Sequence, residues 1–385
     1  MAATAVSTAA LERLARLETA GHPVLSVYFD LDPSRFPTPA TRDAELSALL
    51  SRAGGRDVDA ERVRDAVGAH PALAQGAQSV AIFSCAATGA LEVLALPEPV
   101  EPLVIVDTVP WLEPLAAMVT SENWGVAVLS RRAARLFRAV PPGRAPRSRR
   151  AARLFRGGSE GLVEFATVQD ELHRRHAQGG WSQARFQRGI EQQVAEHARH
   201  VAELLLRAHR RRPFDQLAIV ASDELWPVVE ASLHHDLRDR LAGVIKRDLE
   251  HAAAEEILQA VSPVVERAEH DRERALISRL EEALGTGGAA TAGLDEVLAT
   301  FEQKRVEVLL VADRASLTAG LCSLCGRLSA SGDGTCQLDG APLVSVDAIE
   351  HLIALAAQRS VDVVVVRHEL DALREHGHVA ALLRW

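Results

Sequence analysis

Residues 178–188 read QGGWSQARFQR, and this stretch is the most informative part of the chain. Two consecutive glycines, Gly179 and Gly180, give a backbone that adopts conformations closed to other residues and can approach a ligand closely. Trp181 offers a large stacking surface in a chain of which only 4% is aromatic. Ser182 is a typical N-cap residue. The stretch therefore predicts a loop that runs directly into a capped helix.

The helix after this loop is expected to be long, from Ala184 to Arg211, and Pro213 ends it. Its apolar positions recur at the spacing of one helical face, with Arg and Glu between them; they are Val194, Ala198, Val201, Leu205 and Ala208. Arg185 and Arg188 lie three residues apart and share one face of the first turns. The pattern predicts an amphipathic helix with arginines next to the loop.

Positive charge is concentrated in the middle of the chain. Residues 131–212 hold 19 arginines and 7 acidic residues, although the whole chain has a net charge of −9. A basic segment between acidic flanks indicates one surface that faces a polyanion. The alternative is an arginine-rich composition with solvated side chains.

The octet RRAARLFR occurs twice, at 131–138 and 149–156, with a turn-forming PPGRAP segment between the copies. Two strands of a basic hairpin fit this pattern, and arginine binds phosphate with two parallel hydrogen bonds. A chance duplication in an alanine- and arginine-rich chain explains it equally well. The candidate RNA-binding residues are Arg131, Arg132, Arg135, Arg149, Arg150, Arg153, Arg185 and Arg188.

The chain as a whole is expected to be an α/β protein of three domains, spanning 1–117, 118–284 and 285–385. Apolar runs predict strands at 24–29, 79–84, 103–106, 125–129, 216–221, 306–311 and 361–366. Helical patterns are expected at 8–19, 42–52, 224–233, 251–284, 293–303 and 346–358, with a bend or break at Pro263. The strand, helix and strand at the C-terminal end predict a parallel pair.

The loop resembles the catalytic loop of the eukaryotic and archaeal class-1 peptide chain release factors, which is Gly-Gly-Gln followed by Ser and an Arg-Phe pair. Gly179, Gly180, Ser182 and the pair Arg185-Phe186 match that frame. Trp181 stands where the family has its glutamine, and Gln183 follows two residues later, as in variants that rescue stalled ribosomes. Residues 26–34 are similar to the bacterial branch of the superfamily, whose other members include Pelota-type and Balon-type factors.

The resemblance implies a middle domain with an RNase-H-like mixed sheet and a last domain shared with Pelota-type factors. It also implies hydrolysis of the peptidyl-tRNA ester on the large ribosomal subunit, at the A site and independent of the codon. Glutamine has no titratable group, so Gln183 would orient water and stabilise the oxyanion, with help from the backbone of Gly179 to Ser182 and from an RNA 2′-OH. The alternative is a hibernation factor that occupies the A site without chemistry and arrives with an elongation-factor GTPase.

Three of the four cysteines are clustered. Cys322-x-x-Cys325 and Cys336-x-x-Asp339 form two halves of a zinc-ribbon pattern over 322–339, in which Asp339 is a weaker fourth ligand than cysteine. The predicted cofactor is a structural zinc ion; the alternative is a decayed site that folds without metal. Archaeal members of the family carry a similar insertion.

Other classes of function find little support. The first twenty residues lack a continuous apolar region, and no run approaches the length that spans a bilayer, so a cytoplasmic protein without a membrane partner is expected. Phosphate-binding glycine motifs are absent, so no nucleotide cofactor is expected. DNA is not expected as a partner. His234, His235 and Asp236 are neighbours on a predicted helix, where side chains point in different directions, so they predict no site.

Overall fold

The computed structural model describes residues 4–5, 7–31, 36, 38–69, 79–96, 100–119, 123–139, 162–169, 183–332 and 334–385. The chain divides into two compact units. The terminal unit combines both ends of the chain and comprises Met1–Thr120, Pro142–Leu154 and His270–Trp385. The middle unit comprises Ser121–Pro141 and Phe155–Glu269. The α/β class is confirmed, whereas the division into three domains stays a prediction.

The N-terminal part of the terminal unit is a five-stranded sheet of order β1-β4-β3-β2-β5, antiparallel except for the β1–β4 pair. Its strands are β1 (Thr4–Ala5), β2 (Val24–Asp30), β3 (Ser79–Cys85), β4 (Ala90–Leu96) and β5 (Leu103–Asp107). The helices around it are α1 (Thr8–Ala15), α2 (Pro39–Leu50), the short 3₁₀ helix η1 (Ser51–Ala53), α3 (Asp57–Ala69) and α4 (Glu113–Met118). The predicted strands are all present, while β4 and α3 carry weaker patterns and were not predicted.

The C-terminal part contains a four-stranded sheet of order β11-β17-β12-β16. Its strands are β11 (Ala290–Ala292), β12 (Val306–Ala312), β16 (Asp362–Val366) and β17 (Val379–Leu383), and its helices are α9 (Leu294–Glu302), α10 (Ala348–Gln358) and α11 (Leu370–Glu375). The pair β12–β16 is parallel, as predicted. A small sheet of order β14-β13-β15 follows β12; it consists of β13 (Thr318–Cys322), β14 (Leu328–Ser329) and β15 (Leu343–Asp347).

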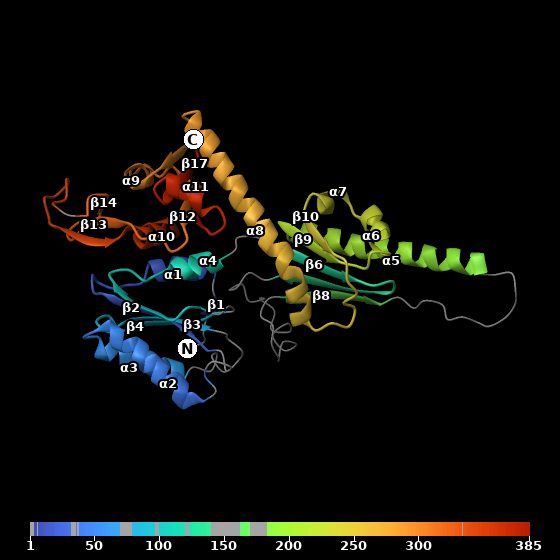
Figure 1. Ribbon diagram of the computed structural model, residues 1–385, viewed down its shortest axis with the longest axis horizontal. Helices are drawn as coiled ribbons and strands as arrows, with labels where there is room; N and C mark the ends of the chain where they lie inside the picture. Colours follow the sequence, from blue (N-terminus) through green and yellow to red (C-terminus); the bar gives the residue numbers. More distant parts are fainter. Residues whose placement is uncertain are drawn as a thin grey trace. The chain divides into compact units, whose positions relative to one another are not determined.

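Strand β2 shows why the two ends of the chain form one unit. Successive side chains of a strand point to opposite faces, and β2 is buried throughout. Leu25, Val27 and Phe29 pack on one face against α2 and α3. On the other face, Val24 and Tyr28 join a core that includes α1, α4, α9, α10 and β12. A single hydrophobic core therefore connects the N-terminal sheet to the C-terminal segment (Figure 1).

The middle unit is built on a mixed sheet of order β10-β9-β6-β7-β8, in which β10, β9 and β6 are parallel and β7 and β8 are antiparallel to their neighbours. The strands are β6 (Trp124–Leu129), β7 (Ala133–Ala139), β8 (Leu162–Gln169), β9 (Gln216–Val220) and β10 (Leu241–Ile245). The helices α5 (Gln183–Arg211), α6 (Trp226–Ser232) and α7 (His235–Arg238) contribute to the core on one face. The predicted mixed sheet is present.

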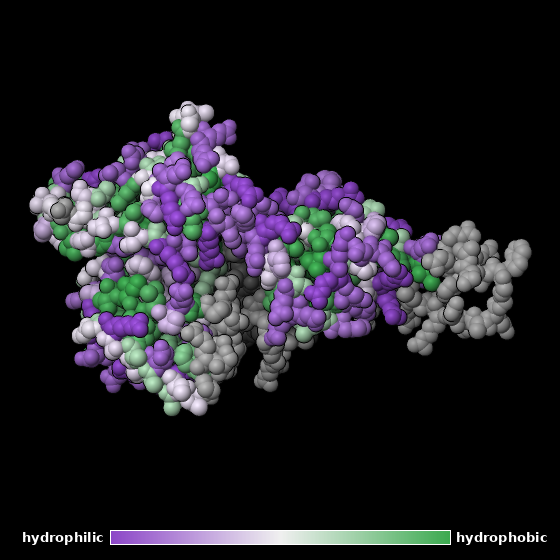
Figure 2. Space-filling view, viewed as in Figure 1, coloured by the Kyte–Doolittle hydropathy of each residue, from purple (hydrophilic) through white to green (hydrophobic). Residues whose placement is uncertain are grey.

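Helix α8 (Ala254–Gly285) contributes to both units. Its first half packs Ile257, Val261 and Val264 on the second face of the mixed sheet, and a side chain at Gly243 would meet Val264 at 2.9 Å. Its second half packs on the C-terminal sheet. The helix is continuous, so the break predicted at Pro263 does not occur; the packed side chains on either side compensate for the backbone bond that proline lacks. This face of α8 is largely hydrophilic (Figure 2).

Candidate functional site

Helix α5 carries the predicted catalytic loop at its N-terminal end. Gln183 is the first residue of this 29-residue helix. Gly179, Gly180, Trp181 and Ser182 lie outside the described residues, as do the side chains of Gln183, Arg185 and Arg188. Among the described side chains of α5, core contacts begin at the partly buried Ile190 and continue at Val194, Ala198, Val201 and Leu205. At about 1.5 Å per residue, the helix begins roughly 10 Å before Ile190, and Figure 1 shows this end protruding past the sheet.

The first copy of the octet forms the turn between β6 and β7. Ser130 Oγ accepts the backbone N–H of Ala133 at 3.0 Å, which holds the turn closed and presents Arg131 and Arg132. Arg131 forms an ion pair with Glu224. The guanidinium of Arg132 is exposed and has no hydrogen-bond partner among the described residues. Of these two arginines, Arg132 is therefore the one open to an external anion.

Arg135 is committed to contacts within the middle unit. Its guanidinium pairs with Glu164 at 3.1 Å, donates to the carbonyl of Ala252 at 2.7 Å and lies 5.0 Å from the centre of the Phe137 ring. These contacts connect β7 to β8 and to the segment before α8. Its predicted role in RNA binding therefore competes with a structural role that is visible in the fold.

The predicted hairpin between the two octets is wrong. Strand β7 pairs along one edge with β6 and along the other with β8, from Ala133↔Gln169 to Ala139↔Leu162. Both edges are thus occupied, and the partner is residues 162–169. The second octet, with Arg149, Arg150 and Arg153, lies outside the described residues. Polar and apolar residues alternate less regularly in 162–169, so the sequence favoured the octet as the partner strand.

Arg138, the last residue of the first octet, connects β7 to the end of α5. Its guanidinium lies 4.2 Å from the centre of the Phe214 ring and donates to the carbonyl of Arg212 at 2.8 Å. Burial, together with the nearby charge of Arg212, lowers the pKa of Arg138 to about 10. The sequence did not distinguish this arginine, which fixes α5 to the sheet, from those that face outward.

The cysteine cluster is formed by two turns of the same geometry. In the first, Gly326 N donates to Cys322 O at 3.0 Å and Cys322 N donates to Arg327 O at 2.9 Å. In the second, Gly340 N donates to Cys336 O at 2.9 Å and Cys336 N donates to Ala341 O at 2.8 Å. Each turn needs a left-handed residue at its end, and the glycines supply it with φ of 70° and 71°. The predicted paired halves are therefore present as backbone structure.

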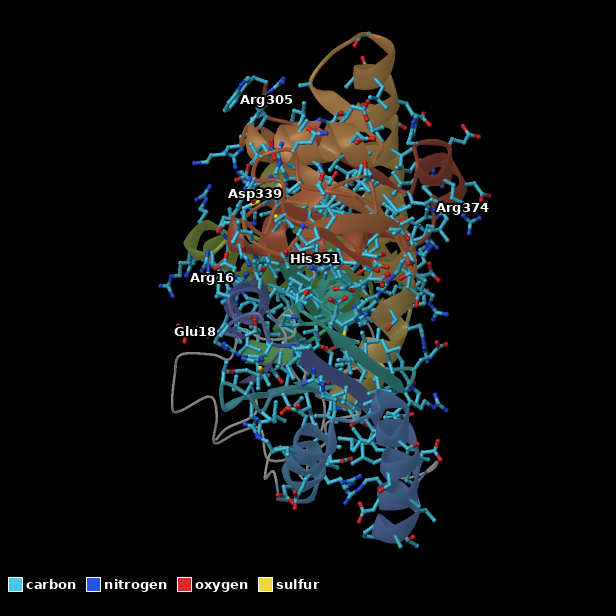
Figure 3. The ribbon with its side chains drawn as sticks, turned by 90° about the vertical axis from the view of Figure 1, so that its left-hand side faces the viewer. Arg16, Glu18, Arg305, Asp339, His351 and Arg374 are labelled. Atoms are coloured by element: carbon cyan, nitrogen blue, oxygen red, sulfur yellow. The ribbon has the colours of Figure 1, made fainter. Side chains whose placement is uncertain are left out.

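The four side chains converge, as Figure 3 shows for Asp339 beside the sulfur atoms. The donor atoms of Cys322, Cys325, Cys336 and Asp339 all lie within 4.8 Å of one another. Cys325 Sγ is 3.7 Å from Cys336 Sγ, and Cys322 Sγ is 3.3 Å from Asp339 Oδ2. Zinc bonds of about 2.3 Å to sulfur and 2.0 Å to oxygen place tetrahedral neighbours roughly 3.8 Å (S to S) and 3.5 Å (S to O) apart. The donor set and its spacing fit a tetrahedral metal ion.

Electrostatics at the cluster favour a thiolate at Cys322, whereas the hydrogen bond to Asp339 raises the pKa of the Cys325 thiol to about 12. The backbone N–H groups of Cys325 and Leu324 donate to Cys322 Sγ, and these bonds lower the pKa of that thiol. The hydrogen bond from the Cys325 thiol and the backbone N–H of Ala341 lower the pKa of Asp339 to about 2. Thiolate and carboxylate are the forms that bind metal. Cys85 lies apart, buried at the end of β3.

A family model for bacterial archaeo-eukaryotic release factors, family 10, matches residues 147–268. The match includes the loop, the whole of α5 and the strand β9. Residues 147–268 are therefore similar to the archaeo-eukaryotic release factors, which agrees with the resemblance seen in the loop. The model that matches describes a bacterial branch of that superfamily.

Among solved structures, an archaeal translation termination factor, aRF1, is 17% identical, with 99% of each chain covered and a TM-score of 0.27. Pelota from Archaeoglobus fulgidus is 15% identical over 80% of this chain and 79% of that one, with a TM-score of 0.36. Dom34 from S. cerevisiae, a translation termination-like factor that interacts with Hbs1, is 11% identical over 77% and 73%, also at 0.36. Such TM-scores do not establish a common arrangement of the whole chain. No curated protein matches.

None of the described helices is long and apolar enough to cross a membrane.

Proposed function

We propose that this protein binds the A site of the large ribosomal subunit and hydrolyses the peptidyl-tRNA ester there, in codon-independent rescue of stalled ribosomes. The observation that carries the proposal is the start of α5 at Gln183, at the end of the helix that extends past the sheet. A helix that is packed on the sheet further along and extends past it at one end can carry a loop into a narrow RNA-lined site. The family match, which includes this segment, supports the same function.

In this proposal Gln183 is the catalytic side chain. Its amide donates a hydrogen bond to the developing oxyanion and orients the attacking water. Gly179 and Gly180 allow the backbone to approach the 3′ adenosine, while Trp181 and Ser182 set the shape of the loop. Arg185 and Arg188 contact RNA phosphates. An amide cannot remove a proton at neutral pH, so the RNA 2′-OH completes the proton transfer.

The second candidate is a hibernation factor that occupies the A site without chemistry. The observation that favours it is Trp181, which replaces the glutamine of the family's Gly-Gly-Gln. By analogy with Dom34, which interacts with Hbs1, an elongation-factor-like GTPase is the proposed delivery partner in either case. The RNase-H-like character of the mixed sheet belongs to the same proposal.

The experiment that separates the candidates measures release of labelled peptide from peptidyl-tRNA on stalled ribosomes and on split large subunits. Release by the wild-type protein, together with co-sedimentation with the particle, supports the hydrolase. Tight binding without release on either particle supports the hibernation factor. Failure to bind either particle contradicts both.

Arg132→Ala is expected to weaken binding to ribosomes several-fold and to reduce the slope of log K against log salt concentration by about one, as for the loss of one phosphate contact. The physical reason is its exposed guanidinium, which has no partner among the described residues. Arg135→Ala is the comparison: it breaks the contacts with Glu164 and Ala252 and should lower stability more than it changes the salt slope. Co-sedimentation at a series of salt concentrations measures both. An unchanged slope for Arg132→Ala would remove it from the RNA contact.

The cysteine cluster is proposed to hold a structural zinc ion that fixes the small sheet. Metal-stripped protein should take up one equivalent of Co²⁺ with thiolate charge-transfer absorption. Mutation of a residue that only orients a metal ligand typically lowers metal affinity 10- to 100-fold. Cys336→Ser replaces a ligand itself, so it should lower the affinity for Co²⁺ by at least about 100-fold. Cys85→Ala removes a thiol outside the cluster and should leave the absorption unchanged. Equal Co²⁺ affinity of Cys336→Ser and wild type would contradict the site.

A further inference from the structure

Three side chains with metal-binding atoms converge on the surface of the middle unit. The donor atoms of His234, His235 and Asp236 lie within 4.8 Å of one another. The sequence pattern predicted that these neighbours diverge on a helix, and that prediction is wrong. His234 has an extended backbone, with φ −66° and ψ 150°, and caps the four-residue helix α7 rather than belonging to it. Its side chain therefore folds back over the first turn, where His235 and Asp236 lie.

The distances within this group match those between ligands of one metal ion. His235 Nε2 is 2.9 Å from Asp236 Oδ1, and His234 Nδ1 is 3.3 Å from Asp236 Oδ2. Ligand atoms about 2.1 Å from a metal ion lie roughly 3.0 Å apart in octahedral and roughly 3.4 Å apart in tetrahedral coordination. The two imidazole rings lie together as well, with centres 4.1 Å apart. Each imidazole thus lies beside one oxygen of the same carboxylate.

His234 Nδ1 accepts the backbone N–H of Asp236 at 3.3 Å. At 3.3 Å this hydrogen bond is long, and a metal ion that bound Nδ1 would take its place, because the nitrogen has a single lone pair. Neutral imidazole and carboxylate are ligands that Zn²⁺, Co²⁺ and Ni²⁺ accept.

We propose that His234, His235 and Asp236 bind a divalent transition-metal ion of the class that includes Zn²⁺. Three protein ligands leave at least one coordination position to water. The donors are accessible, since the side chain of His235 is 75% exposed and those of the other two are 35% exposed. Figure 2 shows the surface over α7 as hydrophilic. This site belongs to the middle unit, whereas the cysteine cluster belongs to the terminal unit.

Titration of the metal-stripped full-length protein with Co²⁺ tests the proposal, because ligand type is visible in the spectrum. Besides the equivalent bound by the cysteine cluster, the wild-type protein is expected to bind a second equivalent of Co²⁺. This second equivalent should show only weak d–d bands and no thiolate absorption. His235→Ala and Asp236→Asn are each expected to weaken this equivalent at least tenfold and to leave the thiolate band unchanged. His234 is left intact because it caps α7.

The control is His251→Ala. His251 also lies beside a carboxylate, that of Glu250 at 3.8 Å, but among the described residues it belongs to no group of three metal-binding side chains. This variant should bind Co²⁺ as the wild type does. Far-UV circular dichroism should be the same for all variants, because the replaced side chains contribute to no core. The proposal is overturned if the wild-type protein lacks the weakly absorbing equivalent, or if both variants retain it with unchanged affinity.

Discussion

A Gln183→Ala variant is expected to bind ribosomes as tightly as the wild-type protein and to release peptide about 100- to 1000-fold more slowly. Loss of one hydrogen-bond donor to a developing oxyanion typically slows a reaction by that factor. Binding is expected to persist, because it depends on the arginines and on the surface of the middle unit rather than on one amide. Single-turnover release of labelled peptide at saturating protein concentration measures the chemical step separately from binding.

Gln192→Ala is the matched control, since Gln192 lies on the same helix and its amide donates to Glu196 at 3.0 Å. It should release peptide at the wild-type rate. If both variants release as fast as the wild type, Gln183 is not the catalytic side chain, and the loop backbone would have to be tested next. If Gln183→Ala also fails to bind, Gln183 acts in docking rather than in the reaction.

The sequence predicted most of the regular structure, because long apolar periodicities survive in the fold. Strand β2 and helix α5 lie within one residue of their predicted bounds. The zinc-ribbon spacing also led directly to two matching turns, since each half is a local motif closed by its own glycine. Local signals of this kind need no information from elsewhere in the chain.

Features that depend on distant partners or on backbone departures were not predictable. The repeated octet predicted that its two copies pair with each other. In the fold, residues 162–169 occupy the edge of β7 instead. His234 looked helical, and its extended cap conformation depends on where the helix actually begins. Arg135 and Arg132 look alike in the sequence, yet only one of them meets Glu164 across the sheet. Such distinctions require the three-dimensional neighbours.

Glu350 is the clearest case of a residue whose role comes from a distant segment. It is fully buried on α10 and accepts the backbone N–H groups of Leu112 at 2.6 Å and Glu113 at 3.0 Å, at the start of α4. Glu113 in turn accepts the backbone N–H of Arg314. Nearby, Thr108 Oγ1 is 3.3 Å from Nε2 of His351, which Figure 3 shows where the C-terminal ribbon meets the N-terminal one. These bonds join the two ends of the chain inside their shared core.

Glu350→Ala is therefore expected to lower the free energy of unfolding of the terminal unit by about 3 kcal/mol or more. The variant leaves two buried N–H groups without an acceptor, and each such group costs roughly 1–3 kcal/mol. Urea unfolding followed by circular dichroism measures the change. Glu281→Ala, at an exposed position of α8, is the control and should stay within about 0.5 kcal/mol of the wild type.

The dependence on pH gives a sharper test than the size of the loss. Burial raises the pKa of the Glu350 carboxyl well above its ordinary value of 4.5, although the N–H groups of Leu112 and Glu113 oppose this. The folded protein then holds a proton that the unfolded chain has lost, so this contribution to stability is complete below pH 4.5 and decreases as pH rises towards the folded pKa. Glu350→Gln does not titrate at this position. Its destabilisation relative to the wild type should therefore be larger at pH 5 than at pH 8; a difference that grows with pH would show that Glu350 is held as a stabilised carboxylate instead.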